Sequence, residues 1–240
     1  MRKIILLLLS IYCVLTSCND EIDKSIKYNG SKNIDITLHE IRNLNASSEE
    51  ELKYSSDNPL NVPVSKDGDI KGNNIGDANI TIFNSENEIN VHVNVSLFRE
   101  PTLNFGCSQE DIISLYGTPT GYTDSVIYYG GIGNIWYQPE VVWTMSFFFE
   151  EDQYYESDLY LSVRNDLRII EYLNENYYFY DTIITDNKDE IFIYLNTPNE
   201  ETATVLVGMQ FNANEENDIC LMYVPYTSEN RLRFRRGLRH

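Results

Sequence analysis

Residues 99–227 contain a weak internal repeat, which constrains the possible folds of this chain more than any single motif. Each copy opens with a helical pattern. In the first copy, Ser108 is placed to cap a helix that Gly117 and Pro119 terminate. In the second copy, residues 165–177 carry apolar side chains at helical spacing, namely Leu167, Ile170, Leu173 and Tyr177. The repeat therefore predicts two short helices.

Three extended runs follow each predicted helix. They are residues 126–129, 141–149 and 159–163 in the first copy, and 191–195, 202–211 and 219–224 in the second. The long middle runs alternate, which puts one set of apolar side chains on one face: Trp143, Met145, Phe147, Phe149, Val205, Val207, Met209 and Phe211. We therefore predict an α+β domain over residues 99–227, with two αβββ units in one antiparallel sheet and helices on one face.

Residues 34–98 carry the pattern of a separate all-β domain. Residues 34–38, 80–82 and 91–95 alternate between apolar and polar side chains, as strands with one buried face do. Turn-forming clusters separate the runs. This spacing predicts a small sandwich, and Arg99-Glu100-Pro101 marks its end because proline stops a strand.

Two resemblances refine these predictions. Residues 54–59, 64–68, 70–72 and 76–81 resemble, in order, the motifs of the group 2 bacterial Ig-like domain, although Tyr54 stands where that family usually has tryptophan. The segment from Phe105 to Pro119 resembles the opening of tandem α+β repeats like those of β-lactamase inhibitor protein, and the second copy lacks its glycines. Both resemblances imply binding or presentation rather than catalysis.

The N-terminus predicts export and lipidation. Residues 1–17 form a basic start and a short apolar run, which suits a secretory signal and is too short to span a membrane. Leu15-Thr16-Ser17-Cys18 resembles the lipobox of bacterial lipoproteins, in which the signal is cut before an acylated cysteine. Residues 18–33 then form an acidic tether, as in surface-exported lipoproteins of the Bacteroidetes. We expect an outer-membrane lipid anchor on Cys18, with the protein facing the cell surface or, alternatively, the periplasm.

Charge excludes one class of partner. The chain has 37 Asp and Glu against 18 Lys and Arg, a formal net charge of -19, so nucleic-acid binding has no electrostatic support. The exception is the basic C-terminal tail, residues 228–240, which we interpret as a solvated terminus. Beyond Cys13 and Cys18, only Cys107 and Cys220 remain, and their spacing leaves open whether they pair.

No catalytic, metal or cofactor site is predicted. The three histidines cluster with no cysteine, and no nucleophile elbow, phosphate loop or dinucleotide motif is present. Acidic pairs such as Glu215-Glu216 are explained by solvated turns. The loop at residues 186–190 has oxygen ligands, but Lys188 and the lack of a glycine favour a plain turn over a calcium site.

Aromatic side chains are the best candidates for a binding surface. We name Trp136, Tyr137, Tyr128 and Tyr154 as ligand contacts, because exposed tyrosine and tryptophan supply large contact areas at low entropic cost. The alternative is that these rings only fill the sheet. We expect a non-enzymatic binding or adhesion module for a protein or glycan. Two alternatives remain open: a structural or assembly subunit of an envelope complex, and a hydrolase.

Overall fold

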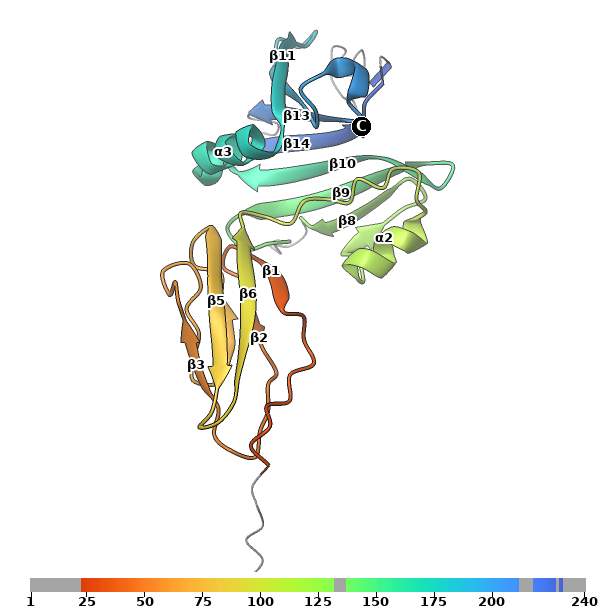
Figure 1. The fold of residues 1–240 in the computed structure, drawn as a ribbon. Helices are drawn as coiled ribbons and strands as arrows, with labels where there is room; N and C mark the ends of the chain where they lie inside the picture. Colours follow the sequence, from red (N-terminus) through yellow and green to blue (C-terminus); the bar gives the residue numbers. More distant parts are fainter. Residues whose placement is uncertain (1–22, 132–136, 212–217, 228, 231–240) are drawn as a thin grey trace, which may run out of the picture.

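The computed structural model describes residues 23–131, 137–211, 218–227 and 229–230. Two domains are visible: an N-terminal β-sandwich that lies below a large sheet carrying two helices on one face (Figure 1). The predicted fold class, an all-β Ig-like sandwich followed by an α+β domain, is confirmed. Within the described ranges, no helix combines the length and the apolar character needed to cross a membrane.

The N-terminal domain contains six strands in two sheets. The larger sheet has the order β1-β6-β5-β3, with β1 parallel to β6, and the smaller sheet pairs β2 with β4. The bounds are β1 (Asn33–Thr37), β2 (Ile41–Asn43), β3 (Lys53–Ser56), β4 (Asp69–Lys71), β5 (Gly76–Phe83) and β6 (Glu88–Ser96). The predicted alternation holds, because Ile34, Ile80 and Val93 all point into the core between the sheets.

The C-terminal domain is built on one antiparallel sheet of eight strands in the order β11-β12-β13-β14-β10-β9-β8-β7. Its first unit comprises α2 (Gln109–Tyr116), β7 (Gly121–Tyr122), β8 (Val126–Gly130), β9 (Val142–Glu150) and β10 (Gln153–Ser162). After the turn η1 (Val163–Asn165), the second comprises α3 (Asp166–Asn176), β11 (Tyr178–Ile184), β12 (Glu190–Leu195), η2 (Glu200–Thr202), β13 (Val205–Phe211) and β14 (Asp218–Pro225). Strands β10 and β14, the last of each unit, pair at the centre.

Each unit therefore has four strands, where the sequence predicted three. The missed strands, β7 and β11, form the two edges of the sheet. Strand β7 is only two residues long, and along β11 only Ile183 is buried. Edge strands with so little burial carry no clear alternation, which explains why the pattern did not reveal them.

A β-bulge corrects the predicted position of Trp143. Along β9 the pairing with β10 skips from Thr144 to Val142, so Trp143 is the extra residue. The bulge turns Val142 into the core, where its side chain is fully buried, and leaves Trp143 half-buried. Met145, Phe147 and Phe149 occupy the core face as predicted. The prediction that Trp143 is a core residue is therefore wrong.

The two helices begin by different means. Helix α2 has a capping box: Ser108 Oγ accepts from the Asp111 backbone N–H at 3.2 Å, and Asp111 Oδ2 accepts from the Ser108 N–H at 3.0 Å. It ends at Gly117, as predicted, at φ 81°. Helix α3 has no side-chain cap. Its buried positions are Ile169 and Leu173, whereas Leu167, predicted to face the core, is exposed.

The segment between the domains is part of the C-terminal core. It crosses the helix-covered face of the sheet before α2 (Figure 1), and Tyr154 of β10 holds it there through hydrogen bonds to Thr102 O, Gly106 N and Cys107 O. Leu97 and Phe98 are buried in the same cluster as Phe147, and so is Leu38 of the N-terminal domain. The predicted boundary at residues 98–99 therefore runs through a continuous apolar core.

The opposite face of the sheet also carries a buried cluster, confined largely to the second unit. It contains Ile183, Ile191, Ile193, Leu195, Leu206, Cys220, Met222 and Val224. The sequence pattern predicts only one apolar face for this sheet, so the second face is a finding of the structure. Cys107 packs against the helix-covered face and Cys220 belongs to the opposite one, and both thiols are free.

Candidate functional site: a cleft between the domains

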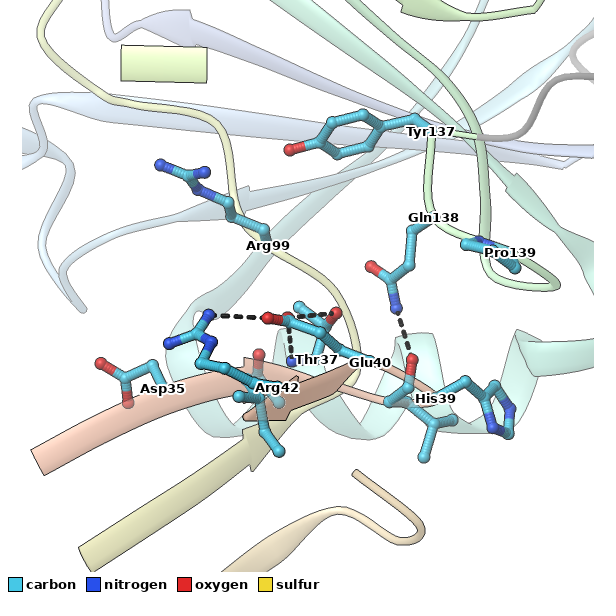
Figure 2. Close-up of a pocket in the computed structure, with 12 residues that line it drawn as sticks. Asp35, Thr37, His39, Glu40, Arg42, Arg99, Tyr137, Gln138 and Pro139 are labelled. Atoms are coloured by element: carbon cyan, nitrogen blue, oxygen red, sulfur yellow. Dashed lines mark hydrogen bonds and ion pairs between the residues drawn. The ribbon is translucent and has the colours of Figure 1, made fainter. Parts of the chain in front are cut away.

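A cleft of about 720 Å³ opens where the two domains meet. One wall is the turn from β1 to β2 in the N-terminal domain. The other is formed by Arg99 of the interdomain segment and by residues 137–139, which precede β9 (Figure 2). The walls come from segments about a hundred residues apart in the chain, so the cleft exists only because the domains are held together.

Gln138 joins the two walls. Its backbone N–H donates to Val142 O at 3.0 Å, which fixes the residue at the start of β9. Its side-chain Nε2 donates to Leu97 O at 2.8 Å and to Leu38 O at 3.2 Å. The side chain is 6% exposed. Both amide hydrogens thus tie the C-terminal domain to backbone carbonyls at the domain junction.

The other end of the same amide is unsatisfied. Gln138 Oε1 is buried and has no hydrogen-bond partner among the described residues. In Figure 2 this oxygen points toward the space between Arg99 and Glu40. A buried acceptor without a partner costs on the order of 1–3 kcal/mol. Because the amide nitrogen is held in place, the oxygen is a fixed acceptor buried in the wall of the cleft.

Tyr137 and Arg99 form the upper part of the cleft in Figure 2, where the tyrosine hydroxyl points toward the guanidinium. The Tyr137 ring is half-buried and lies 6.1 Å from the ring of Tyr129. Burial raises the pKa of Tyr137, and the charge of Arg99 partly offsets this rise. Arg99 is exposed, and its guanidinium lies 4.5 Å from the ring centre of Tyr116.

The facing wall is rigid and carries paired charges. Glu40 Oε2 accepts from the backbone N–H of Thr37 at 3.0 Å and from its hydroxyl at 3.2 Å. Glu40 Oε1 accepts from Arg42 at 2.6 Å. His39, between Thr37 and Glu40 in the turn, has a left-handed backbone at φ 69°. Both oxygens of Glu40 are therefore engaged, and its charge is matched by Arg42.

The four residues predicted to contact a ligand do not lie together in the structure. Tyr137 lines the cleft, and Trp136 lies outside the described residues. Tyr128 is half-buried on β8, opposite Gly121 of β7. Tyr154 is 1% exposed, and its hydroxyl hydrogen-bonds to Thr102 O and Ser157 Oγ, so the prediction that it contacts a ligand is wrong. Cys18 also lies outside the described residues.

Sequence reasoning missed Gln138, Arg99 and Arg42. One signal was present: arginines are scarce at described positions, and Arg99 falls at the boundary between the predicted domains. Polar side chains near a domain junction are candidates for a cleft. Elsewhere in the described ranges, no group of three or more His, Cys, Asp or Glu side chains is arranged to hold a metal ion.

No protein-family model matches this sequence, and no curated protein is significantly similar to it. Among solved structures, a bacterial Ig-like domain containing GH10 xylanase from termite gut is 16% identical, with a TM-score of 0.26, covering 35% of this chain and 23% of that one. Domains 4–9 of the surface layer protein SbsC are 11% identical, with a TM-score of 0.29, covering 87% of this chain and 28% of that one. This chain thus spans roughly a quarter of each structure, and neither similarity defines its function.

Proposed function

We propose that this protein is a cell-envelope lipoprotein that binds a glycan, without catalysis, in the cleft between its domains. The observation that carries this proposal is the fixed, unsatisfied Gln138 Oε1 beside the Tyr137 ring. A sugar offers a hydroxyl for such an acceptor and an apolar ring face for an aromatic side chain. The cleft volume of about 720 Å³ lies within the usual range for small-ligand sites, roughly 300–1,000 Å³.

The arrangement of carboxylates favours binding over hydrolysis. Glycoside hydrolysis commonly requires two carboxyl groups with separate roles. Asp35 and Glu40 both line the cleft, but Thr37 and Arg42 engage both oxygens of Glu40. Asp35 itself accepts a hydrogen bond from Asn94 Nδ2 at 3.2 Å. The pair is therefore held as part of the wall, which supports a non-enzymatic role.

Binding is tested with residues 19–240 produced without the signal and titrated calorimetrically against a panel of bacterial and plant oligosaccharides. Tyr137→Ala is expected to weaken the affinity for any bound sugar about tenfold or more, because it removes the ring at the cleft. Tyr122→Ala is the matched control, since Tyr122 is 70% exposed on β7 and does not line the cleft. Equal loss in both variants, or no binding by the unsubstituted chain, would contradict the proposal.

The anchor is tested separately. Cys18→Ala is expected to move the protein from the detergent phase to the aqueous phase, because acyl chains hold a protein at the membrane with ~0.8 kcal/mol per buried methylene. Unchanged partitioning would show that Cys18 is not lipidated.

A second candidate function, a subunit of an envelope assembly, is favoured by edge strand β11. Three large side chains on this strand are more than half exposed: Tyr178, Phe179 and Ile184. An exposed edge can pair with another chain. If β11 is an interface, then Phe179→Glu should disrupt an oligomer detected by light scattering, whereas a monomer at high micromolar concentration would exclude self-assembly through this edge.

A further inference from the structure

We propose that the glycan bound in the cleft is acidic, and that Arg99 recognises its carboxylate as an uronic acid or a related sugar would present it. This inference rests on the proposed function and narrows it to one ligand class. It follows from the charge state of the cleft, from the way Arg99 is held, and from the positions of Tyr137 and Gln138.

Arg99 is the cleft cation without an acidic partner. Arg42 is paired with Glu40 at 2.6 Å, but Arg99 takes part in no ion pair within the residues that the structure describes. Within the cleft, Glu40 matches the charge of Arg42, whereas no carboxylate among the described residues matches that of Arg99, so Arg99 leaves a place for an anion from outside.

The guanidinium is oriented before any ligand arrives. The guanidinium carbon lies 4.5 Å from the centre of the Tyr116 ring, Nη2 reaches Leu115 O at 3.5 Å, a long and weak contact, and the Tyr137 hydroxyl interacts with the guanidinium. These contacts restrain the side chain without satisfying most of its five N–H donors. A planar guanidinium with free donors matches a carboxylate through two parallel hydrogen bonds.

Three neighbouring groups then define the ligand. Arg99 supplies a site for a carboxylate, Tyr137 supplies an aromatic face, and Gln138 Oε1 supplies an acceptor for a hydroxyl (Figure 2). A uronic acid carries a carboxylate, a ring face and hydroxyl groups on one unit. A neutral sugar would leave Arg99 unmatched, and a simple anion would leave the Gln138 acceptor unmatched.

The experiment uses residues 19–240 and pairs of oligosaccharides that differ only in charge. Galacturonate, glucuronate and mannuronate oligomers are each compared with their carboxyl-reduced, neutral counterparts by calorimetric titration. At least one acidic member is expected to bind about tenfold more tightly than its neutral counterpart, because hydrogen bonds to a charged group are stronger than those between neutral groups. Arg99→Gln should abolish that preference, and Arg99→Lys should restore only part of it.

The control is Lys188→Gln, which makes the same change in net charge at an exposed turn between β11 and β12, outside the cleft. Thermal unfolding of each variant shows that it is folded. Equal affinity for acidic and neutral members would overturn the inference and leave glycan binding intact. An acidic preference that survives Arg99→Gln, or that is lost equally in Lys188→Gln, would also overturn it. No binding to any glycan, in this panel or the broader one, would overturn the proposed function as well.

Discussion

The two helix-and-strand units of the C-terminal domain share one topology but bury different side chains. The unit from α2 to β10 has an aromatic core on the helix-covered face, in which Phe147 contacts the rings of Tyr116, Tyr129 and Tyr154. The unit from α3 to β14 has a more aliphatic core on that face, with Val205, Val207, Ile219 and Leu221 among its members. Among the residues that the structure describes, only the second unit also buries a large apolar cluster on the opposite face.

The aromatic unit uses its hydroxyl groups to hold loops. Tyr116 accepts from Thr102 N at 2.7 Å, Tyr154 donates to Thr102 O at 2.9 Å, and Tyr129 donates to Gly117 O at 3.1 Å. These bonds fix the interdomain segment and the end of α2, which together position Arg99 at the cleft. The difference shows that a repeated topology does not require a repeated core. One copy positions a wall of the cleft, and the other copy supplies a second packed face.

The largest expected effect appears at alkaline pH and involves tyrosines of both units. Burial raises the pKa of Tyr129 to about 12, helped by the neighbouring Tyr137 and Tyr116. Burial also raises the pKa of Tyr154, and burial together with the charge of Glu100 raises the pKa of Tyr177. A raised pKa means that the folded state favours the neutral phenol. The stability is therefore complete below about pH 10, where free tyrosine titrates, and falls as the pH rises above it.

Each such tyrosine should lower the free energy of unfolding by about 1.4 kcal/mol per pH unit between pH 10 and its folded pKa. Denaturant unfolding at pH 8 and at pH 11 measures this fall. Tyr129→Phe tests the first unit and Tyr177→Phe the second, and each should reduce the pH slope. A denaturant concentration at the unfolding midpoint that stays constant up to pH 11.5 would show that these phenols are not protected from ionisation.

Core truncations should show whether both faces of the sheet are tightly packed. Phe147→Ala in the first unit should cost about 3–5 kcal/mol, as truncated buried aromatics do. Ile193→Ala, on the second face, should cost about 2–5 kcal/mol, because its side chain is fully buried there. The control Ile184→Ala, 60% exposed on β11, should stay within about 0.5 kcal/mol. A small effect at Ile193 would show that the second face is loosely packed.

The smallest expected difference lies in the helix starts. Ser108→Ala removes the capping box of α2 and should cost about 0.5–2 kcal/mol. Asn165→Ala should cost less, since its side chain does not cap α3 and loses only an exposed hydrogen bond to Glu140 O. Chemical denaturation of the two variants measures both costs. Equal losses would mean that α2 draws its stability from packing rather than from its cap.

Much of the fold follows from the sequence because its causes are local. The alternation along β5, β6, β9 and β13 sets which side chains face a core, and Ser108 and Gly117 set the ends of α2. The candidate site was predicted only in part. Tyr137, which was predicted to contact a ligand, lines the cleft, but Tyr154 was predicted to be exposed and is buried. Adjacent rings on a strand point to opposite faces of the sheet, and the sequence pattern alone does not say which of the two rings is buried.

The sequence by itself determined the two domains, the repeat and the side chains of the main apolar faces. The apolar side chains recur every two residues in a strand and every 3.6 residues in a helix, so neighbouring positions in the sequence are enough to reveal them. Only the tertiary structure decided the bulge that turns Val142 inward in place of Trp143, since a bulge depends on the partner strand. It also decided the cleft. Gln138 and Leu38 are 100 residues apart in the chain, and no local pattern encodes a hydrogen bond across that separation. Folding the interdomain segment onto the sheet creates the contact and places Arg99 and Tyr137 beside it.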